Sequence, residues 1–245
     1  MNLKRFCQKR LNTLYYLWRS RQFLVNPRRI LGIAATNQFC MLTCYDQGLG
    51  ESLARLCDKY GSDKGSMTNY FHKGFHTYVD YYGLLFNQRR ETIKNVFECG
   101  LGKAGASLRV WRDYFPKATI LGVDIDRKIL FQEDRIKTFW VDQTSPEAIR
   151  NLWTEVECND FDLMIDDGLH EFEAGICLFE SSIEKLSNSG HYIIEDVSYD
   201  DIIKFQRYFQ DKSYLVSIIL FFKRRHKGID SYLISIQNMK SLPTF

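Results

Sequence analysis

The 245-residue sequence predicts an α/β protein: a doubly wound, mostly parallel seven-stranded sheet with a C-terminal antiparallel hairpin, plus a helical N-terminal extension. Three observations support this fold class. From residue 93 onward, short apolar runs alternate with stretches of helical periodicity, and tandem strand–helix units form parallel sheets with both faces covered. The last two apolar runs have no helical stretch between them. The first 45 residues differ from the rest in charge.

The same patterns place each element along the chain. The expected helices are residues 51–60, 75–85, 106–114, 146–156, 172–186 and 200–209. The expected strands are residues 95–99, 119–123, 137–141, 161–165, 192–194, 214–222 and 231–236. Ser145 and Pro146 suit the N-cap and the first position of their helix. Residues 223–230 are too few for a crossover helix, so the two strands that they join should form the antiparallel hairpin.

Charge divides the chain into a basic helical extension, residues 1–57, and a main domain, residues 58–245. Residues 1–45 contain eight basic residues and no acidic residue, whereas acidic residues outnumber basic ones in the remainder. Apolar residues near helical spacing at the start predict an amphipathic helix. Such a helix would contact an anionic membrane or nucleic acid, or dock on a neighbouring subunit.

Hydropathy and cysteine usage predict a cytoplasmic protein. No apolar run reaches the roughly 18–20 residues that are needed to span a bilayer. The seven cysteines are scattered and form no CxxC pair, which favours free thiols in a reducing compartment over disulfides or a zinc site.

A glycine-rich loop follows the first strand of the main domain and indicates a nucleotide-type ligand. Gly100 and Gly102 let the chain turn sharply and approach a ligand without Cβ clashes. The pattern from Gly100 to Gly105 is GxGxxG, so a dinucleotide is the main rival. Glu98 is a poor neighbour for a pyrophosphate but a good partner for the ammonium of a methionine moiety. This favours S-adenosylmethionine (SAM) as the ligand.

Acidic residues also end the second and third strands. Asp124 is placed to accept hydrogen bonds from both hydroxyls of a ribose, which suits SAM and NAD equally. Asp142 and Gln143 are placed to bind an adenine amino group. The alternative is that these acids cap helices or turns.

A second acidic cluster follows the fourth and fifth strands. If these strands are neighbours, Asp167, Glu195 and Asp196 converge at the carboxyl edge of the sheet, where α/β proteins bind ligands. Three close carboxylates repel one another unless they are protonated or bridged by a cation, and Mg²⁺ is the first choice for oxygen ligands. His170, across a glycine turn, could accept a proton as a general base. The alternative is a solvated acidic rim.

Roughly residues 58–200 resemble the metal-dependent sugar O-methyltransferases of macrolide biosynthesis, typified by the mycinamicin and macrocin enzymes, and the related cephalosporin-pathway methyltransferase group. The motifs that carry this resemblance are Gly61-Ser62-Asp63-Lys64-Gly65, His76-Thr77-Tyr78, Glu98-Cys99-Gly100-Leu101-Gly102, Ser107-Leu108-Arg109-Val110-Trp111-Arg112-Asp113-Tyr114-Phe115-Pro116, Gly122-Val123-Asp124-Ile125-Asp126, Asp142-Gln143, Ile165-Asp166-Asp167-Gly168-Leu169-His170 and Ile194-Glu195-Asp196. The Asp-Asp-Gly-x-His element and the run from Ser107 to Pro116 are the most specific.

The resemblance implies a class I SAM-dependent methyltransferase fold for residues 58–245 and a reaction at a sugar-like hydroxyl. It implies that Asp167, Glu195 and Asp196 bind Mg²⁺ or Mn²⁺ and that His170 is the general base. The residues that it assigns to the SAM site are Asp63, Lys64, Glu98, Gly100, Gly102, Ser107, Asp124, Asp142, Gln143 and Asp166.

The expected partners are a small-molecule acceptor, a sugar or polysaccharide precursor, and a second copy of the chain, with no nucleic acid. Two other functions stay open. One is an NAD-dependent oxidoreductase, which would leave the second acidic cluster without a role. The other is a SAM-fold protein that binds a partner or membrane through its basic extension and catalyses nothing.

Overall fold

The structure is a computed structural model that describes residues 39–44, 48–68, 76–102, 105–222 and 229–238. Its strands form one sheet in the order β1-β8-β9-β7-β6-β2-β3-β5-β4. The bounds of the strands are β1 Phe39–Cys44, β2 Asn95–Cys99, β3 Thr119–Asp124, β4 Gln132–Glu133, β5 Ile136–Trp140, β6 Phe161–Asp166, β7 Leu186–Val197, β8 Tyr214–Phe222 and β9 Ile229–Asn238.

The mixed topology confirms the predicted fold class. Strands β5, β3, β2, β6 and β7 pair in parallel, and β9 runs antiparallel to both β7 and β8. The expected seven strands form the continuous centre of the sheet. The sheet has nine strands and not seven, because β1 and the two-residue β4 add one short strand at each edge.

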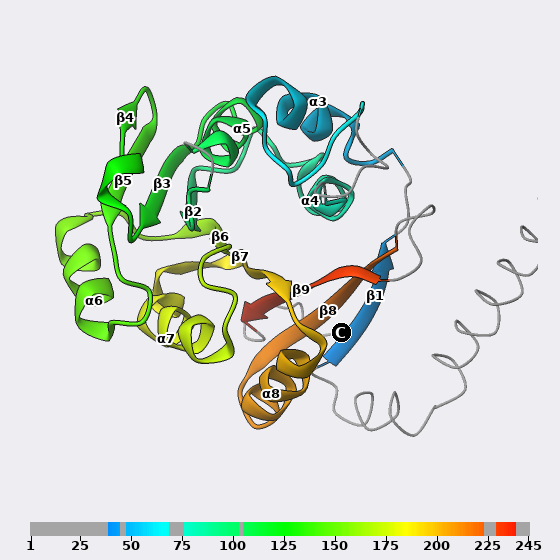
Figure 1. Ribbon diagram of the computed structural model, residues 1–245, viewed down its shortest axis with the longest axis vertical. Coiled ribbons are helices and arrows are strands. Elements are labelled where there is room, and N and C mark those ends of the chain that lie inside the picture. The colour runs from blue at the N-terminus through cyan, green and yellow to red at the C-terminus, as the bar shows by residue number, and fades with distance from the viewer. Residues whose placement is uncertain (1–38, 45–47, 69–75, 103–104, 223–228, 239–245) are drawn as a thin grey trace, which may run out of the picture. The chain divides into compact units, whose positions relative to one another are not determined.

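Helices cover both faces of the sheet (Figure 1). On one side lie α3 (Glu51–Tyr60), α4 (Tyr78–Phe86) and α5 (Ala106–Tyr114). On the other side lie α6 (Pro146–Glu155), α7 (Phe172–Ser182) and α8 (Tyr199–Phe209). Two short 3₁₀ turns, η1 (Arg127–Ile129) and η2 (Ile183–Lys185), complete the elements. This arrangement leaves the carboxyl ends of the parallel strands open to a ligand.

Local signals place several boundaries correctly. The hydroxyl of Ser145 accepts a hydrogen bond from the amide of Ala148 at 3.2 Å, with Pro146 in the first turn, as expected for the cap of α6. The 75–85 helix begins later, at Tyr78, and the 172–186 helix tightens into the turn η2 after Ser182. The expected helix within residues 1–38 lies outside the described residues.

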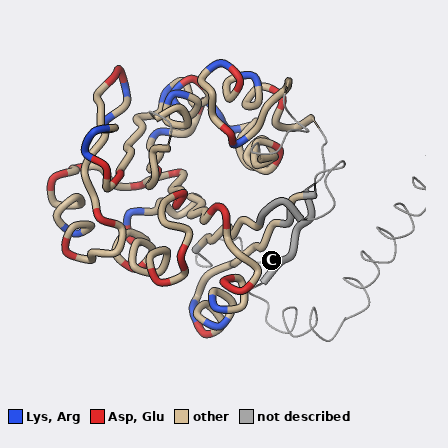
Figure 2. The backbone as a smooth tube through the Cα atoms, viewed as in Figure 1, with Lys and Arg blue, Asp and Glu red and all other residues tan. Residues whose placement is uncertain are grey.

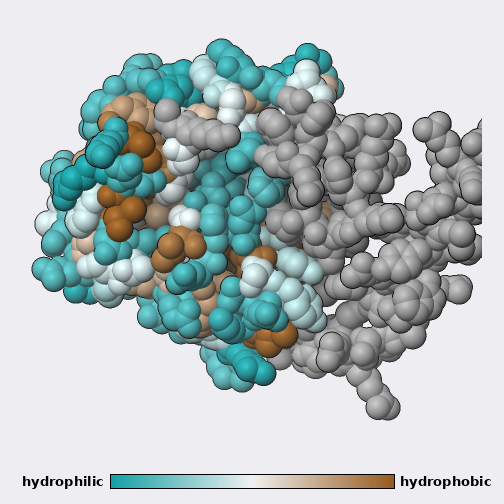
Figure 3. Space-filling view, viewed as in Figure 1, coloured by the Kyte–Doolittle hydropathy of each residue, from teal (hydrophilic) through white to brown (hydrophobic). Residues whose placement is uncertain are grey.

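Charged and hydrophobic residues are mixed in the views drawn in Figures 2 and 3. Acidic and basic residues are interspersed along the described backbone in Figure 2. On the face drawn in Figure 3, hydrophobic residues lie in separate groups among hydrophilic ones. Among the described residues, no helix combines the length and hydrophobicity that crossing a membrane requires. Cys57, Cys99, Cys158 and Cys177 are free thiols.

A buried histidine makes the stability of the domain sensitive to acid. His191 in β7 is 7% exposed, and its ring nitrogens lie 3.2 Å from the hydroxyl of Ser235 and 3.2 Å from the side-chain amide of Gln237. Burial and the nearby charge of Arg89 lower the pKa of His191 to about 4. The folded domain therefore holds this ring neutral, whereas the unfolded chain protonates it below about pH 6.5.

We expect the free energy of unfolding to fall by up to about 3 kcal/mol as pH drops from about 6.5 to 4, because only the unfolded state binds the extra proton in this window. Urea titrations between pH 4.5 and 7.5 measure the loss. His191→Gln keeps a neutral hydrogen-bonding side chain and should flatten this part of the profile. An equal pH dependence in both proteins would assign the acid sensitivity to other groups.

Candidate functional site

One cavity of about 750 Å³ lies at the carboxyl ends of the parallel strands. It is lined by residues from the β2, β3, β5, β6 and β7 ends and by the loop that follows α3. Of the predicted site residues, those that line it are Asp63, Lys64, Gly100, Gly102, Ser107, Asp124, Asp142, Gln143, Asp167, His170, Glu195 and Asp196. Glu98 and Asp166 are absent from this lining, and both are buried behind it.

The glycine loop forms the floor of the cavity through a close backbone crossing. Gly100 has a φ of +90°, and a Cβ at this position would lie 2.1 Å from the carbonyl oxygen of Asp167. The amide of Leu101 donates to Oδ2 of Asp124 at 2.8 Å, and the amide of Asp126 donates to Oδ1 at 2.9 Å. Asp124 therefore ties the end of β3 to the loop while still facing the cavity.

Asp142 takes part in the turn contacts that sequence reasoning left open as an alternative. Its Oδ1 accepts the amide of Thr144 at 2.9 Å and the hydroxyl of Thr144 at 2.7 Å, and these bonds lower the pKa of Asp142. Gln143 bridges two chain segments: its Nε2 donates to Asp166 at 2.6 Å, and its Oε1 accepts the amide of Leu169 at 2.9 Å. Burial raises the pKa of Asp166 to about 6 against the bonds from Gly168 and Gln143. The roles of these residues toward a cofactor stay predictions.

Three predicted residues meet at the edge of the cavity. One potential ligand atom from each of Asp167, His170 and Asp196 lies within 4.8 Å of the other two. Strands β6 and β7 are parallel neighbours, with Asp166 opposite Ile194. Asp167 and Asp196, which follow these two residues, therefore lie at the same edge of the sheet. His170 and Asp196 have φ values of 57° and 51°, a left-handed conformation that is costly for residues other than glycine. Such strain at a cavity is typical of a functional site.

Glu195 points elsewhere than its neighbour Asp196. Its Oε2 lies 2.5 Å from the ammonium of Lys64, and its Oε1 accepts a hydrogen bond from the hydroxyl of Tyr82 at 2.5 Å. Glu195 is 1% exposed. Its role as a metal ligand stays a prediction, because within the described residues the three that form the possible metal group do not include it.

Lys64 lies at the centre of this buried cluster. Its ammonium is 2.7 Å from Asp167 Oδ2 and 3.2 Å from Glu98 Oε1, in addition to its contact with Glu195. Burial acts to lower the pKa of Lys64, but the charges of Asp167, Glu195 and Glu98 outweigh it and hold the pKa well above its usual value. The lysine is therefore charged, and it supplies positive charge that offsets the repulsion among these acids.

Glu98 consequently meets an ammonium of this chain at the position where the ammonium of a ligand was expected. It is fully buried, accepts a hydrogen bond from the indole of Trp111 at 2.8 Å, and also contacts Ser107. Its role at the cofactor stays a prediction.

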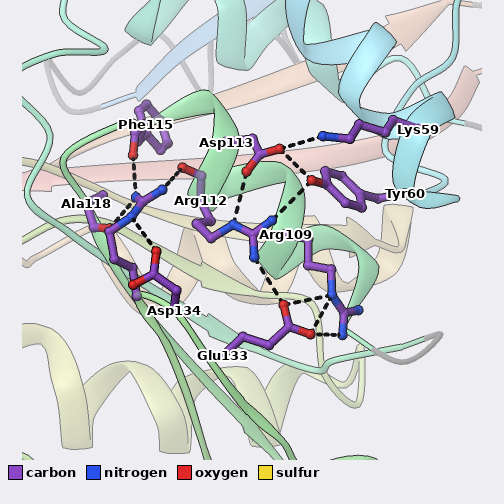
Figure 4. Close-up of polar contacts among 10 residues, drawn as sticks. Lys59, Tyr60, Arg109, Arg112, Asp113, Phe115, Ala118, Glu133 and Asp134 are labelled. Carbon is purple, nitrogen blue, oxygen red and sulfur yellow. Dashed lines mark hydrogen bonds and ion pairs between the residues drawn. The ribbon is translucent and has the colours of Figure 1, made fainter.

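A network of ion pairs and hydrogen bonds anchors α3, the helix that precedes the loop with Lys64 (Figure 4). Asp113 of α5 accepts hydrogen bonds from Lys59 at 2.9 Å and Tyr60 at 2.5 Å, both in the last turn of α3, and from Arg112 at 3.0 Å. Although partial burial opposes it, these bonds lower the pKa of Asp113 to about 2. Arg112 and Arg109 also bind Glu133 of β4. Part of the Ser107–Pro116 motif thus fixes α3 and does not line the cavity.

Sequence reasoning assigned no role to three aromatic residues around α4. The hydroxyl of Tyr78 donates to Asp196, and the ring of His76 stacks on Tyr78 with 4.6 Å between centroids. His76 Nδ1 lies 3.7 Å from Asp196 Oδ1, and Tyr82 binds Glu195. The His76-Thr77-Tyr78 motif was the available signal, but its spacing alone does not show that it faces the end of β7.

Comparison with known proteins supports a methyltransferase relationship. The chain is 33% identical over 151 residues to 8-demethyl-8-alpha-L-rhamnosyl tetracenomycin-C 2'-O-methyltransferase of Streptomyces olivaceus, covering 59% of this chain and 37% of that protein. It is 32% identical over 128 residues to demethylmacrocin O-methyltransferase of Streptomyces fradiae, covering 50% and 32%. The matched region thus spans about a third of these relatives. No protein-family model matches the chain.

Solved structures show the same fold. MycE methyltransferase from the mycinamycin biosynthetic pathway, in complex with Mg, SAH and mycinamycin VI, superposes with a TM-score of 0.58 at 21% identity, covering 79% of this chain and 57% of that one. A second crystal form, with Mg and SAH, gives a TM-score of 0.57. The chain therefore has the class I methyltransferase fold and resembles, over 59% of its length, the 2'-O-methyltransferase of a rhamnosyl tetracenomycin.

Proposed function

We propose that this protein is a SAM- and Mg²⁺-dependent O-methyltransferase that acts on a hydroxyl of a sugar or sugar-like small molecule. The observation that carries the proposal is the meeting of Asp167, His170 and Asp196 at the edge of the cavity, in a fold shared with Mg- and SAH-bound MycE methyltransferase. By its name, one of these relatives methylates the 2' oxygen of a rhamnosyl tetracenomycin, which supports the acceptor class.

The cavity fits a nucleoside with an attached amino acid. Its 750 Å³ lies within the range of small-ligand sites, and the glycine loop allows close approach at Gly100 and Gly102. Asp124 and Asp142 line the part of the cavity at the β3 and β5 ends, where a ribose and an adenine would lie. SAM would supply an electrophilic methyl group, so the protein's share is to position the acceptor and to exclude water.

The acidic edge of the cavity fits a hard divalent cation. Asp167 and Asp196 would hold the ion through carboxylate oxygens. Glu195, which also lines the cavity, is the third candidate. The ion would acidify a coordinated acceptor hydroxyl. Tyr78 would orient Asp196 through its hydrogen bond, and Lys64 would orient Asp167.

His170 is the residue best placed to take the proton from the acceptor. It is exposed at the rim of the cavity, and one of its ring nitrogens lies within 4.8 Å of an oxygen of each of the two carboxylates. A neutral imidazole in this position accepts the hydroxyl proton while the oxygen attacks the methyl group.

Other parts of the proposal concern setting and assembly. The free thiols of Cys57, Cys99, Cys158 and Cys177 support a reducing, cytoplasmic location. We expect a homo-oligomer. We expect no nucleic-acid substrate, since acidic residues outnumber basic ones after residue 45.

Ligand binding separates this function from an NAD-dependent oxidoreductase. We expect calorimetry to show S-adenosylhomocysteine (SAH) binding at micromolar concentrations and no comparable heat with NADH. We also expect methyl transfer from labelled SAM to simple rhamnosides. Its rate should fall at least tenfold when EDTA removes Mg²⁺ and should recover when Mg²⁺ is added back. Binding of NADH in preference to SAH, or transfer that EDTA leaves unchanged, would contradict the proposal.

A further inference from the structure

The carboxylates at the acidic edge of the cavity are connected through one buried ammonium. Lys64 is 2% exposed, and its Nζ lies 2.7 Å from Asp167, 2.5 Å from Glu195 and 3.2 Å from Glu98. Glu98 and Glu195 are at most 1% exposed, so water does not balance their charge. Lys64 is therefore their shared counter-charge in the metal-free protein.

Lys64 carries one positive charge against three acidic groups, although burial raises the pKa of Glu98 and raises that of Glu195 well above its usual value. The excess negative charge is directed toward the cavity, because the side chain of Asp167 is 24% exposed while those of Glu98 and Glu195 are buried. Asp196 adds a further carboxylate beside it. A divalent ion at this edge would thus meet a site whose negative charge Lys64 has already reduced.

The loop that carries Lys64 is fixed on both sides, so the ammonium has a defined position. Before it, Lys59 and Tyr60 are bound to Asp113. After it, Asp58 accepts hydrogen bonds from the hydroxyl of Ser66 and from the amide of Met67. A Cβ on Gly65 would lie 2.5 Å from the side chain of Val79, so this segment packs directly on α4.

We propose that Lys64 is a positioning residue that holds the carboxylates of β2, β6 and β7 in place before a metal binds, and that weakens the binding of the divalent ion by its own charge. The effect of Lys64 on binding of the divalent ion rests on the proposed function. Asp167 is thereby kept in one orientation toward the cavity, and the fold of this edge does not depend on bound metal.

The test is Lys64→Met, which keeps an unbranched side chain one atom shorter and removes its charge. In EDTA we expect the thermal midpoint to fall by several degrees, because buried carboxylates lose their counter-charge. Added Mn²⁺ should recover more of the midpoint in the variant than it adds to the wild type. Mn²⁺ affinity, measured by electron paramagnetic resonance, should rise at least about tenfold, because a positive charge next to the ion is gone. Lys117→Met, at an exposed lysine, is the matched control and should change neither quantity.

Charge restoration distinguishes this role from packing. Lys64→Met combined with Glu195→Gln removes one buried acid together with the ammonium, so its stability in EDTA should rise above that of the single variant and its Mn²⁺ affinity should return to the wild-type value or below. If Lys64→Met does not fold in EDTA, folding that appears with Mn²⁺ or in the double variant supports the proposal.

Three results would overturn it: an equal midpoint loss with and without Mn²⁺, a double variant no more stable than the single one, or a wild type that binds no Mn²⁺. Absence of methyl transfer in a wild type that does bind Mn²⁺ would instead count against the proposed function alone.

Discussion

Replacing His170 with asparagine should lower the rate of methyl transfer a hundredfold or more, the usual contribution of a general base, while SAH affinity stays within about threefold of the wild type. Asparagine is the informative substitution because His170 has a φ of 57°, and asparagine tolerates the left-handed conformation better than alanine does. The variant thus removes the imidazole and keeps the turn. Single-turnover transfer from labelled SAM measures the chemical step, and calorimetry measures SAH binding.

A second measurement separates a base from a metal ligand. If His170 acts only on the acceptor, Mn²⁺ affinity should be unchanged in the variant, whereas a ligand would lose it together with activity. Asp160→Asn is the matched control: Asp160 is an exposed residue with a φ of 58°, it does not line the cavity, and its substitution should leave the rate unchanged. Transfer at the wild-type rate by His170→Asn would remove the imidazole from the reaction.

Elements with strong local signals were predictable to the residue. The bounds of α3, β2, α5 and β8 are those expected from periodicity alone. Strand β7 was not: only residues 192–194 were expected, whereas it spans Leu186–Val197. Its first half is the polar run Leu186-Ser187-Asn188-Ser189-Gly190, which becomes a strand because Leu186 pairs with Phe161 of β6. Such pairing is tertiary and leaves no periodic trace in the sequence.

The candidate site could also be predicted only in part. The approach of Asp167 to Asp196 could be predicted, because parallel neighbouring strands bring their carboxyl ends to one edge. The counter-charge could not: Lys64 is 131 residues from Glu195 and enters from a loop outside the sheet. Repulsion among the acids was the correct physical argument, but it did not decide whether protonation, a metal or a lysine relieves that repulsion.

Replacing Gly100 with alanine should destabilise the protein by about 4 kcal/mol, the sum of an overpacked contact and a non-glycine residue at positive φ. A Cβ there would lie 2.1 Å from the carbonyl oxygen of Asp167, and backbone on both sides leaves no flexible side chain to move away. Relief requires the β2 and β6 ends to separate, which displaces Asp167 from Lys64 and widens the floor of the cavity. SAH affinity should therefore fall at least about tenfold as well. Urea unfolding and calorimetry measure the two effects.

Gly102→Ala is the matched control within the same loop. Gly102 also has a positive φ, 51°, but a Cβ at this position would meet no atom within 4 Å. Its substitution should cost only the backbone term, about 1 kcal/mol, so the difference between the two variants isolates the contact between β2 and β6. Equal losses in both variants would mean that conformation alone, and not the crossing of Gly100 over Asp167, demands glycine at the end of β2. A larger loss of stability for Gly100→Ala would instead show that the glycine loop and the acidic edge of the cavity are coupled. A change at Gly100 would then displace Asp167, the carboxylate proposed to hold the metal.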